Sequence, residues 1–431
     1  MIAWKRWLMV APMPTSKRPI RRANRVAILG GGPSGAMAGV MLARAGVDVV
    51  LFARSKRPPI IVGESLVPAI IPFLRELGIE QEVASYSIWK GGATFIHDKE
   101  YTQSFCFHEV RGAKTTYSYN VPRDRFDASV LEAAKRAGVR VVEHSARLRR
   151  VGQSDRVKLS NETLAAAGLD EQPDFIVDAG GRSRQIVCLL DIPTIDGDRR
   201  DDALHAHFEG VEVEIPGNVH TDRLEHGWSW RIPLPGRVSI GIVIDPEFIR
   251  KFGDTPEEQM DAFLREDPII RDFARPARRV TPVVRYTNYQ SRSTRGVGEN
   301  WAMLGDAFGF IDPVFSSGLL IAFEGARDLV HALLEGTDNA LQRYDRKTQH
   351  SLASWQRVIG WFYNGRLLTL FKVGEYVRGT LPGKLLDFHF RKHMPRIFTG
   401  EDATNRYSLG LVEFMVKYGL VGNDPDKMKI N

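Results

Sequence analysis

The chain has 431 residues, of which 43% are hydrophobic and 26% are charged, and it is long enough for two or three packed units. No apolar run is long enough to span a bilayer, and the N-terminal stretch WLMVAP is too short for a signal-peptide core. The cysteines, Cys106 and Cys188, lie far apart without metal-type spacing. We therefore expect a cytoplasmic protein with neither a disulfide framework nor a metal site.

The net charge of +7 belongs to the N-terminus. The first 25 residues contain seven basic side chains and no acidic one, and from residue 26 onward 52 basic residues face 52 acidic ones. We expect residues 1–24 to form a basic, disordered arm, either a docking tail or the result of an early start codon. The balanced remainder argues against nucleic acid as a partner.

Residues 26–52 have the pattern of a dinucleotide-binding unit. An apolar strand at 26–29 runs into GGGPSG at 30–35, then a helix of small and apolar residues, then a second apolar strand at 47–52. Glycines let the backbone approach a pyrophosphate, and the helix N-terminus favours its negative charge. The residues expected to contact the dinucleotide are Gly30, Gly32, Pro33, Ser34 and Gly35.

The end of the second strand lacks an expected residue. An Asp or Glu usually stands there to hold the ribose hydroxyls, but this chain has Ala53 followed by Arg54. Either another residue holds the ribose, or the adenosine is held more weakly. An arginine there also suits a 2′-phosphate, as in NADP, which the later segments make the weaker alternative.

Three later segments resemble the FAD-binding segments of the flavoprotein monooxygenase superfamily. They are VPRDRFDASVLEAA, DFIVDAGGRSRQIV and the stretch from NWAMLGDAF through DPVFSSG into a helix starting near Ser317. The resemblance implies FAD as cofactor, with the N-terminus of that helix pointing at the isoalloxazine edge. The cofactor-binding residues it implies are Arg123, Asp178, Gly305, Asp306, Pro313 and Ser316.

Within this superfamily the chain resembles the flavin-dependent halogenases. VGESLVPAIIPFLRELGI at 62–79, SIWKGGATF at 87–95, GWSWRIP and DPVFSSG occur in the family's order, and the resemblance extends from about residue 25 beyond 330. It adds Glu64 and Ser65 to the cofactor site. Trp228 and Trp230 share one face if their segment is a strand, as ordinary core tryptophans also do. The resemblance implies that both form a wall between flavin and substrate.

The resemblance also implies a halide site and a relay. Backbone N–H groups of Ser317 and Gly318, at a helix start, would bind chloride or bromide. Lys90 would hold the hypohalous acid near the substrate, either as a haloamine or through its ammonium group. The alternative for Lys90 is a surface lysine in a turn before a strand.

One departure from the family points to the substrate class. Tryptophan-type halogenases carry a Glu inside the Asp-Pro loop, where this chain has Phe315. The DPVFSSG form resembles members that act on phenols and pyrroles, often tethered to a carrier protein. No second GxGxxG is visible for NAD(P)H, so a separate flavin reductase is expected to supply reduced FAD. The stretch 389–405 mixes Arg, Lys and His with Phe, and it is interpreted as a solvated charged face or a contact for an acidic partner.

We therefore expect an α/β fold. A Rossmann-like FAD/NAD(P)-binding domain over 25–335 would carry β-sheet insertions at about 85–120 and 200–295 that form the substrate side. Residues 336–431 would form a helical region, because apolar residues recur there every three or four positions. Two rival functions remain open: a monooxygenase or dehydrogenase on the same fold, and a binding protein that has lost its cofactor.

Overall fold

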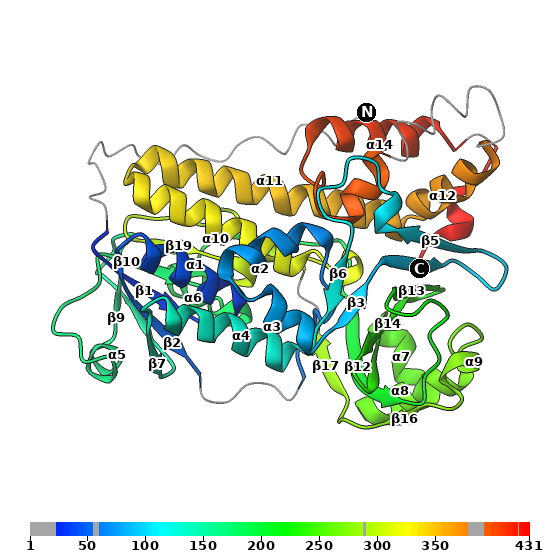
Figure 1. The fold of residues 1–431 in the computed structure, drawn as a ribbon, viewed down its shortest axis with the longest axis horizontal. Helices are drawn as coiled ribbons and strands as arrows, with labels where there is room; N and C mark the ends of the chain where they lie inside the picture. The colour runs from blue at the N-terminus through cyan, green and yellow to red at the C-terminus, as the bar shows by residue number, and fades with distance from the viewer. Residues whose placement is uncertain (1–22, 55–59, 288–289, 378–391, 421) are drawn as a thin grey trace.

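A five-stranded parallel sheet forms one side of the molecule (Figure 1). The computed structural model describes residues 23–54, 60–287, 290–377, 392–420 and 422–431, so the predicted basic arm lies almost wholly outside the described residues. The strand order is β19-β10-β1-β2-β7, and α1 packs between α4 and α10. The strands are β1 (Arg25–Leu29), β2 (Asp48–Ala53), β7 (Arg140–Glu143), β10 (Phe175–Asp178) and β19 (Trp301–Met303), and the helices are α1 (Pro33–Arg44), α4 (Arg123–Arg136) and α10 (Gly318–Glu335).

An eight-stranded sheet forms the second side, in the order β16-β12-β15-β14-β13-β4-β5, with β17 also pairing with β12. Its strands are β4 (Gly92–Ile96), β5 (Thr102–Cys106), β12 (Asp202–Glu209), β13 (Val219–Leu224), β14 (Gly227–Leu234), β15 (Arg237–Ile244), β16 (Arg278–Arg279) and β17 (Val284–Thr287). Side chains alternate across a strand, so Trp228 and Trp230 lie on one face of β14 and Ser229 and Arg231 on the other. A separate apolar core joins β12 and β15 to α7 (Pro246–Ile249), α8 (Pro256–Glu266) and α9 (Arg271–Ala274).

Shorter elements connect the two sheets. Three small sheets contain β3 (Ile88–Lys90) with β6 (Ser118–Asn120), β8 (Leu148–Arg150) with β9 (Val157–Leu159), and β11 (Thr194–Asp196) with β18 (Ser291–Ser293) and β20 (Gly309–Phe310). The short helices are α2 (Ile71–Leu77), α3 (Glu80–Ser85), α5 (Asn161–Ala166) and α6 (Gln185–Leu190). The fold class expected from the sequence is confirmed.

The C-terminal region is helical, as expected, with α11 (Asp338–Tyr363), α12 (Arg366–Val377) and α14 (Arg406–Tyr418). The apolar repeat belongs to two helices, because Gly365 has φ +74° and interrupts the chain between α11 and α12. Its residues are buried, so the repeat is core packing. The interpretation of 389–405 as a solvated charged face is wrong for its described part, since His393 is buried and Arg396 pairs with Glu401 and Asp402.

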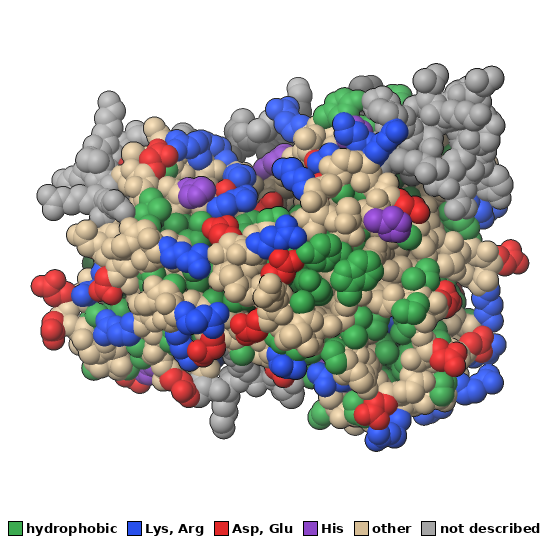
Figure 2. Space-filling model, viewed as in Figure 1, with side chains coloured by type: hydrophobic (Ala, Val, Ile, Leu, Met, Phe, Trp, Pro, Cys, Tyr) green, Lys and Arg blue, Asp and Glu red, His purple; other side chains and the backbone are tan. Residues whose placement is uncertain are grey.

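One face of the described surface agrees with the balanced charge count of residues 26–431. On the face shown in Figure 2, acidic and basic side chains are interspersed over the described elements. No helix among the described residues is both long and apolar enough to cross a membrane.

Candidate active site

A cavity of about 430 Å³ lies between the parallel sheet and the second sheet. It is lined by the glycine-rich turn after β1, by the N-terminus of α10 and by the face of β14 that carries both tryptophans. Of the predicted cofactor and wall residues, those that line it are Gly30, Gly32, Pro33, Ser34, Ser65, Arg123, Trp228, Trp230, Gly305, Asp306, Pro313 and Ser316.

The glycines of the turn differ in how much space surrounds the position of a Cβ atom. Gly30 has φ +120°, and a Cβ there would lie 2.2 Å from the carbonyl oxygen of Ala179. A Cβ on Gly35 would lie 2.2 Å from the carbonyl oxygen of Gly30, so both glycines serve close backbone packing. A Cβ on Gly32 would meet nothing within 4 Å, and this glycine faces the cavity. The turn therefore leaves space beside the N-terminus of α1, as a pyrophosphate requires.

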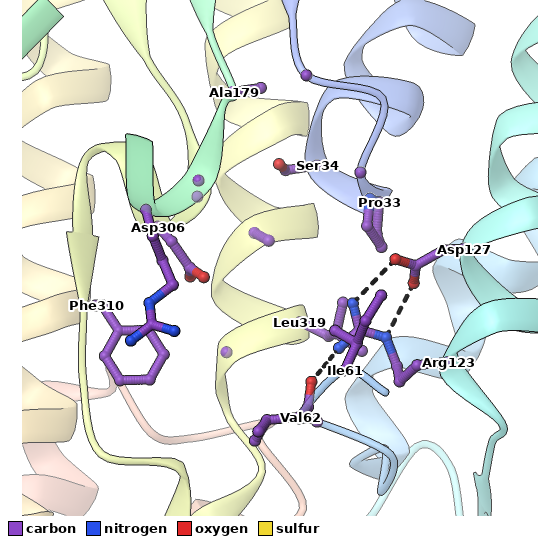
Figure 3. A pocket seen from close by; sticks show the side chains of 18 of the residues that line it. Pro33, Ser34, Ile61, Val62, Arg123, Asp127, Ala179, Asp306, Phe310 and Leu319 are labelled. Atoms are coloured by element: carbon purple, nitrogen blue, oxygen red, sulfur yellow. Dashed lines mark hydrogen bonds and ion pairs between the residues drawn. The ribbon is translucent and has the colours of Figure 1, made fainter. Parts of the chain in front are cut away.

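Charged side chains line the middle of the cavity (Figure 3). Arg123 donates to Asp127 at 2.9 Å and to the carbonyl oxygen of Val62, and these bonds fix its guanidinium in the cavity lining. Asp306 lies across from it. Burial raises the pKa of the Asp306 carboxyl, and the positive charges of Arg123 and Arg182 oppose that shift.

Several predicted cofactor residues lie outside the lining. The carboxylate of Asp178 accepts N–H groups of Gly180 and Ile186 at 3.0 Å each, so it holds the turn after β10 instead of facing the cavity. Glu64 lies 2.9 Å from His207 Nε2 in a buried pair. Gly35 lies behind the turn.

Sequence reasoning missed two cavity residues that had a signal. Asp127 lies four positions after Arg123 on the same helix, which is the spacing of a helical ion pair. Arg182 directly follows the quoted glycines of DAGGR and lies with its guanidinium 4.5 Å from the ring centre of Tyr286. Both line the cavity.

The two tryptophans are both buried and both line the cavity, with their ring centres 5.6 Å apart. Gly241 lies on the neighbouring strand β15, and a Cβ there would lie 2.1 Å from the ring of Trp230. The absence of a side chain at Gly241 therefore leaves space for the indole. Trp230 donates its N–H to Ser239 at 3.2 Å, and Trp228 donates to Tyr363 at 2.9 Å. The strand interpretation of GWSWRIP is confirmed, with the pair on one face.

The turn after β20 ends at the N-terminus of α10. Ser316 has φ +55°, and Ser317 is the N-cap of the helix. Among the described residues, the N–H groups of Ser317 and Gly318 have no hydrogen-bond acceptor, and the buried Ser317 hydroxyl also has no partner. A Cβ on Gly318 would meet nothing within 4 Å. The helix start therefore offers free donors and space to a small anion.

Lys90 lies on β3 and is 2% exposed. Its Nζ donates to Ser65 Oγ at 2.8 Å and to the carbonyl oxygen of Leu66 at 2.9 Å, and it lies 5.5 Å from the ring centre of Phe107. Burial lowers its pKa to about 7. The alternative of a surface lysine in a turn is wrong. Lys90 does not line the cavity, but its partner Ser65 does.

These features define the class of protein: an FAD-binding α/β flavoprotein. A model of the family described as tryptophan halogenase matches residues 25–116 and 108–368. The chain therefore belongs to the flavin-dependent halogenase family, whose members are oxidoreductases that use FAD and a halide.

Two relatives of the chain are named for different substrates. A tryptophan 2-halogenase from Chondromyces crocatus is 27% identical over 376 residues, covering 81% of this chain and 70% of the relative. A 1H-pyrrole-2-carbonyl-[peptidyl-carrier protein] chlorinase from Pseudomonas fluorescens is 24% identical over 377 residues, covering 80% and 84%.

Solved structures share the fold. A flavoprotein/dehydrogenase from Cytophaga hutchinsonii superposes with a TM-score of 0.77 at 22% identity, covering 92% of this chain and 99% of that one. The flavin-dependent halogenase CmlS superposes with a TM-score of 0.67 at 26% identity, covering 81% and 64%.

Proposed function

We propose that this halogenase transfers chlorine or bromine to an electron-rich aromatic ring, a phenol or a pyrrole, by a hypohalous acid relayed through Lys90. The observation that supports the proposal is the arrangement of the two tryptophans and Lys90 at the cavity. Trp228 and Trp230 line the cofactor cavity, and Lys90 is buried against Ser65, another residue of the lining. In the proposal, the two tryptophans are the wall between flavin and substrate, and Lys90 lies on the substrate side.

The described residues fit FAD. The open space at Gly32 and the N-terminus of α1 suit its pyrophosphate, and the buried Asp306 suits a sugar-alcohol hydroxyl. Reduced FAD, when bound, would supply two electrons and two protons, with which O₂, a halide ion and one further proton give hypohalous acid and water. A separate flavin reductase would supply the reduced FAD. Pro313, Ser316 and Gly318 line the cavity. The free N–H groups at the start of α10 would hold the halide beside the flavin ring.

The tryptophan pair excludes the organic substrate from the flavin. Trp228 and Trp230 present two indole rings to the cavity, and both are anchored through their N–H groups. A large ring cannot cross a packed aromatic layer, whereas hypohalous acid has only two heavy atoms. The wall thus favours halide oxidation over direct hydroxylation of the substrate.

Lys90 is suited to receive the hypohalous acid. A pKa of about 7 leaves neutral amine and ammonium both populated at neutral pH. The neutral amine forms an N–X bond and releases water, and the haloamine then passes X⁺ to the ring while the ring's proton leaves. The ammonium form instead polarises the acid by a hydrogen bond. In both cases the ring itself must be nucleophilic.

Phe315 supports a substrate that needs no carboxylate partner. It lies 5.1 Å from Phe398 and 6.4 Å from Trp355, measured between ring centres. No acidic side chain therefore occupies this position of the loop, and a phenol or pyrrole is reactive enough without one. The relative named for a pyrrole on a peptidyl carrier protein makes the carrier-bound form the second substrate to test.

The test compares Lys90→Met with Lys99→Met in the full chain. Methionine keeps an unbranched side chain of similar length at Lys90 and removes the amine, and Lys99 is an exposed lysine on the turn between β4 and β5. Each protein receives FAD, a flavin reductase, NADH and bromide, with free and carrier-bound phenols and pyrroles. We expect halogenated product to fall to background in Lys90→Met alone, while FAD binding and oxygen consumption stay as in the wild type.

The rival functions give different results in the same experiment. A monooxygenase or dehydrogenase gives product that does not depend on bromide, and a binding protein without cofactor shows no flavin spectrum after addition of FAD. Near wild-type bromination by Lys90→Met would contradict the relay.

A further inference from the structure

The two indoles of the wall are anchored in different ways. Trp230 donates to Ser239 on the neighbouring strand, so this bond stays inside the second sheet. Trp228 donates at 2.9 Å to the hydroxyl of Tyr363, the last residue of α11. Of the two, Trp228 is thus the one joined to the helical C-terminal region.

The same hydroxyl reaches the halide-binding loop. Tyr363 donates at 2.7 Å to Oδ2 of Asp312, whose Oδ1 accepts the N–H of Val314 at 3.0 Å. Asp312 caps the turn that leads to Ser317 and Gly318. A tyrosine hydroxyl that accepts from an indole and donates to a carboxylate has both functions in use. It therefore links the wall directly to the loop.

The ring of Tyr363 is held from its other side. The guanidinium of Arg199 lies 4.5 Å from the ring centre, and Arg199 is itself paired with Asp201 at 2.8 Å. The backbone oxygen of Tyr363 accepts the N–H of Ile430 at 2.9 Å, and Ile430 is buried. The hydroxyl is thereby placed by contacts at its ring and its backbone.

We infer that Tyr363 is a positioning residue that sets the gap between Trp228 and the halide loop. This inference rests on the proposed function of the wall and the loop. With the gap fixed, the halide is the small species beside the flavin, and oxygen consumption ends in halogenated product. Without the link, water enters and the consumed oxygen leaves as hydrogen peroxide.

The link depends on the charge of Asp312. The pKa of Asp312 is raised to about 6, chiefly by burial and in part by the nearby Asp201, while hydrogen bonds from Tyr363, Val314 and Trp228 oppose the rise. Arg199 is the cation next to Tyr363. The carboxylate is the stronger acceptor, so the link is present above about pH 6 and weakens as the pH falls through that value. Product yield per oxygen falls with it in the wild type.

The test is Tyr363→Phe, with Tyr86→Phe as its matched control. Tyr86 is also buried, with its hydroxyl 2.9 Å from Ser129 Oγ and Arg125 4.4 Å from its ring centre, but it lies between α3 and α4, away from the wall. Both variants should bind FAD as the wild type does. In Tyr363→Phe alone, we expect product per oxygen to fall about tenfold, since misplaced reacting groups cost such factors. The decline below about pH 6 should also disappear, because the link is already absent.

A second readout does not depend on product. The Trp228 indole N–H resonance, assigned with Trp228→Phe, should exchange with solvent faster in Tyr363→Phe than in the control. If the wild type halogenates and Tyr363→Phe gives the same yield and pH profile, the inference is wrong and the proposed function stands. If the wild type gives no halogenated product, the proposed function fails and the inference fails with it. If Tyr363→Phe does not fold, Asp312→Asn replaces it, and an unchanged yield there overturns the inference.

Discussion

The cofactor end and the wall end of the cavity are built on opposite principles. At the cofactor end, one continuous segment from β1 through α1 to β2 supplies the turn, the helix start and the strand ends. At the wall end, the contacts join Ser65 to Lys90 and Trp228 to Tyr363, residues far apart in the chain. Local backbone geometry sets the first region, and long-range side-chain bonds set the second.

This difference decides what a substitution does. A side chain added at Gly30 or Gly35 of the glycine-rich turn meets backbone atoms, which cannot move without disturbing β1 and β10. A side chain changed at the wall loses a hydrogen bond and leaves the backbone in place. We therefore expect substitution of a packing glycine in the turn to damage the fold, and substitution of a wall side chain to damage the chemistry alone.

The largest expected effect separates two glycines of one turn. In Gly30→Ala the new Cβ overlaps the carbonyl oxygen of Ala179 at a backbone φ of +120°, so we expect a loss of at least about 3 kcal/mol of unfolding free energy. In Gly32→Ala the Cβ meets no protein atom. Its stability should stay within about 0.5 kcal/mol of the wild type. FAD should bind roughly 30-fold more weakly, or about 2 kcal/mol for a lost charge-assisted hydrogen bond.

Urea unfolding of the apoproteins and FAD titration by flavin fluorescence measure the two effects separately. Equal losses of stability in both variants would show that the turn does not distinguish a packing glycine from a cofactor glycine.

The next largest effect is expected at Gly318, in the proposed halide site. Gly318 begins α10 and faces open space, so Gly318→Ala adds a methyl group to the proposed halide site without a clash. Alanine favours helix over glycine, and stability should rise by up to about 1 kcal/mol. The bromide concentration that gives half-maximal product should rise about tenfold, because the methyl group blocks the free N–H groups.

Gly410→Ala is the control for that prediction. Gly410 lies in α14, and its Cβ would also meet nothing within 4 Å. It should gain stability without any change in the dependence on bromide. If the Gly318→Ala enzyme depends on bromide as the wild type does, the halide does not bind at this helix start.

How far the sequence predicted each region follows the same division. The strand, turn and helix at 25–53 and the shared face of Trp228 and Trp230 follow from periodicity and glycine spacing, and the structure has them. Local patterns of this kind are determined by residues next to one another, so they can be read without a fold.

The supports of the wall could not be predicted. Tyr363 lies in the stretch predicted to be helical, and nothing near it in the sequence indicates the bonds to Trp228 and Asp312. Asp178 shows the converse, since its motif suggested a cofactor contact while its carboxylate holds local N–H groups. A hydrogen-bond partner distant in sequence is set by the packing of whole elements.

The smallest expected effect concerns the one feature that the cofactor end lacks. Ala53 ends β2, lines the cavity and faces Gly31, whose Cβ would lie 2.6 Å from that of Ala53. A carboxylate there reaches the ribose side of the turn, so Ala53→Glu should tighten FAD binding about fivefold, or about 1 kcal/mol for one hydrogen bond at the open end of the cavity. Ala53→Gln is the control, because it matches the size without the charge and should gain less.

The wild type should correspondingly lose part of its FAD on dialysis. Stoichiometric FAD after extensive dialysis of the wild type, with no gain in Ala53→Glu, would show that another residue already holds the ribose. The cofactor end would then also depend on a contact that the local pattern does not reveal.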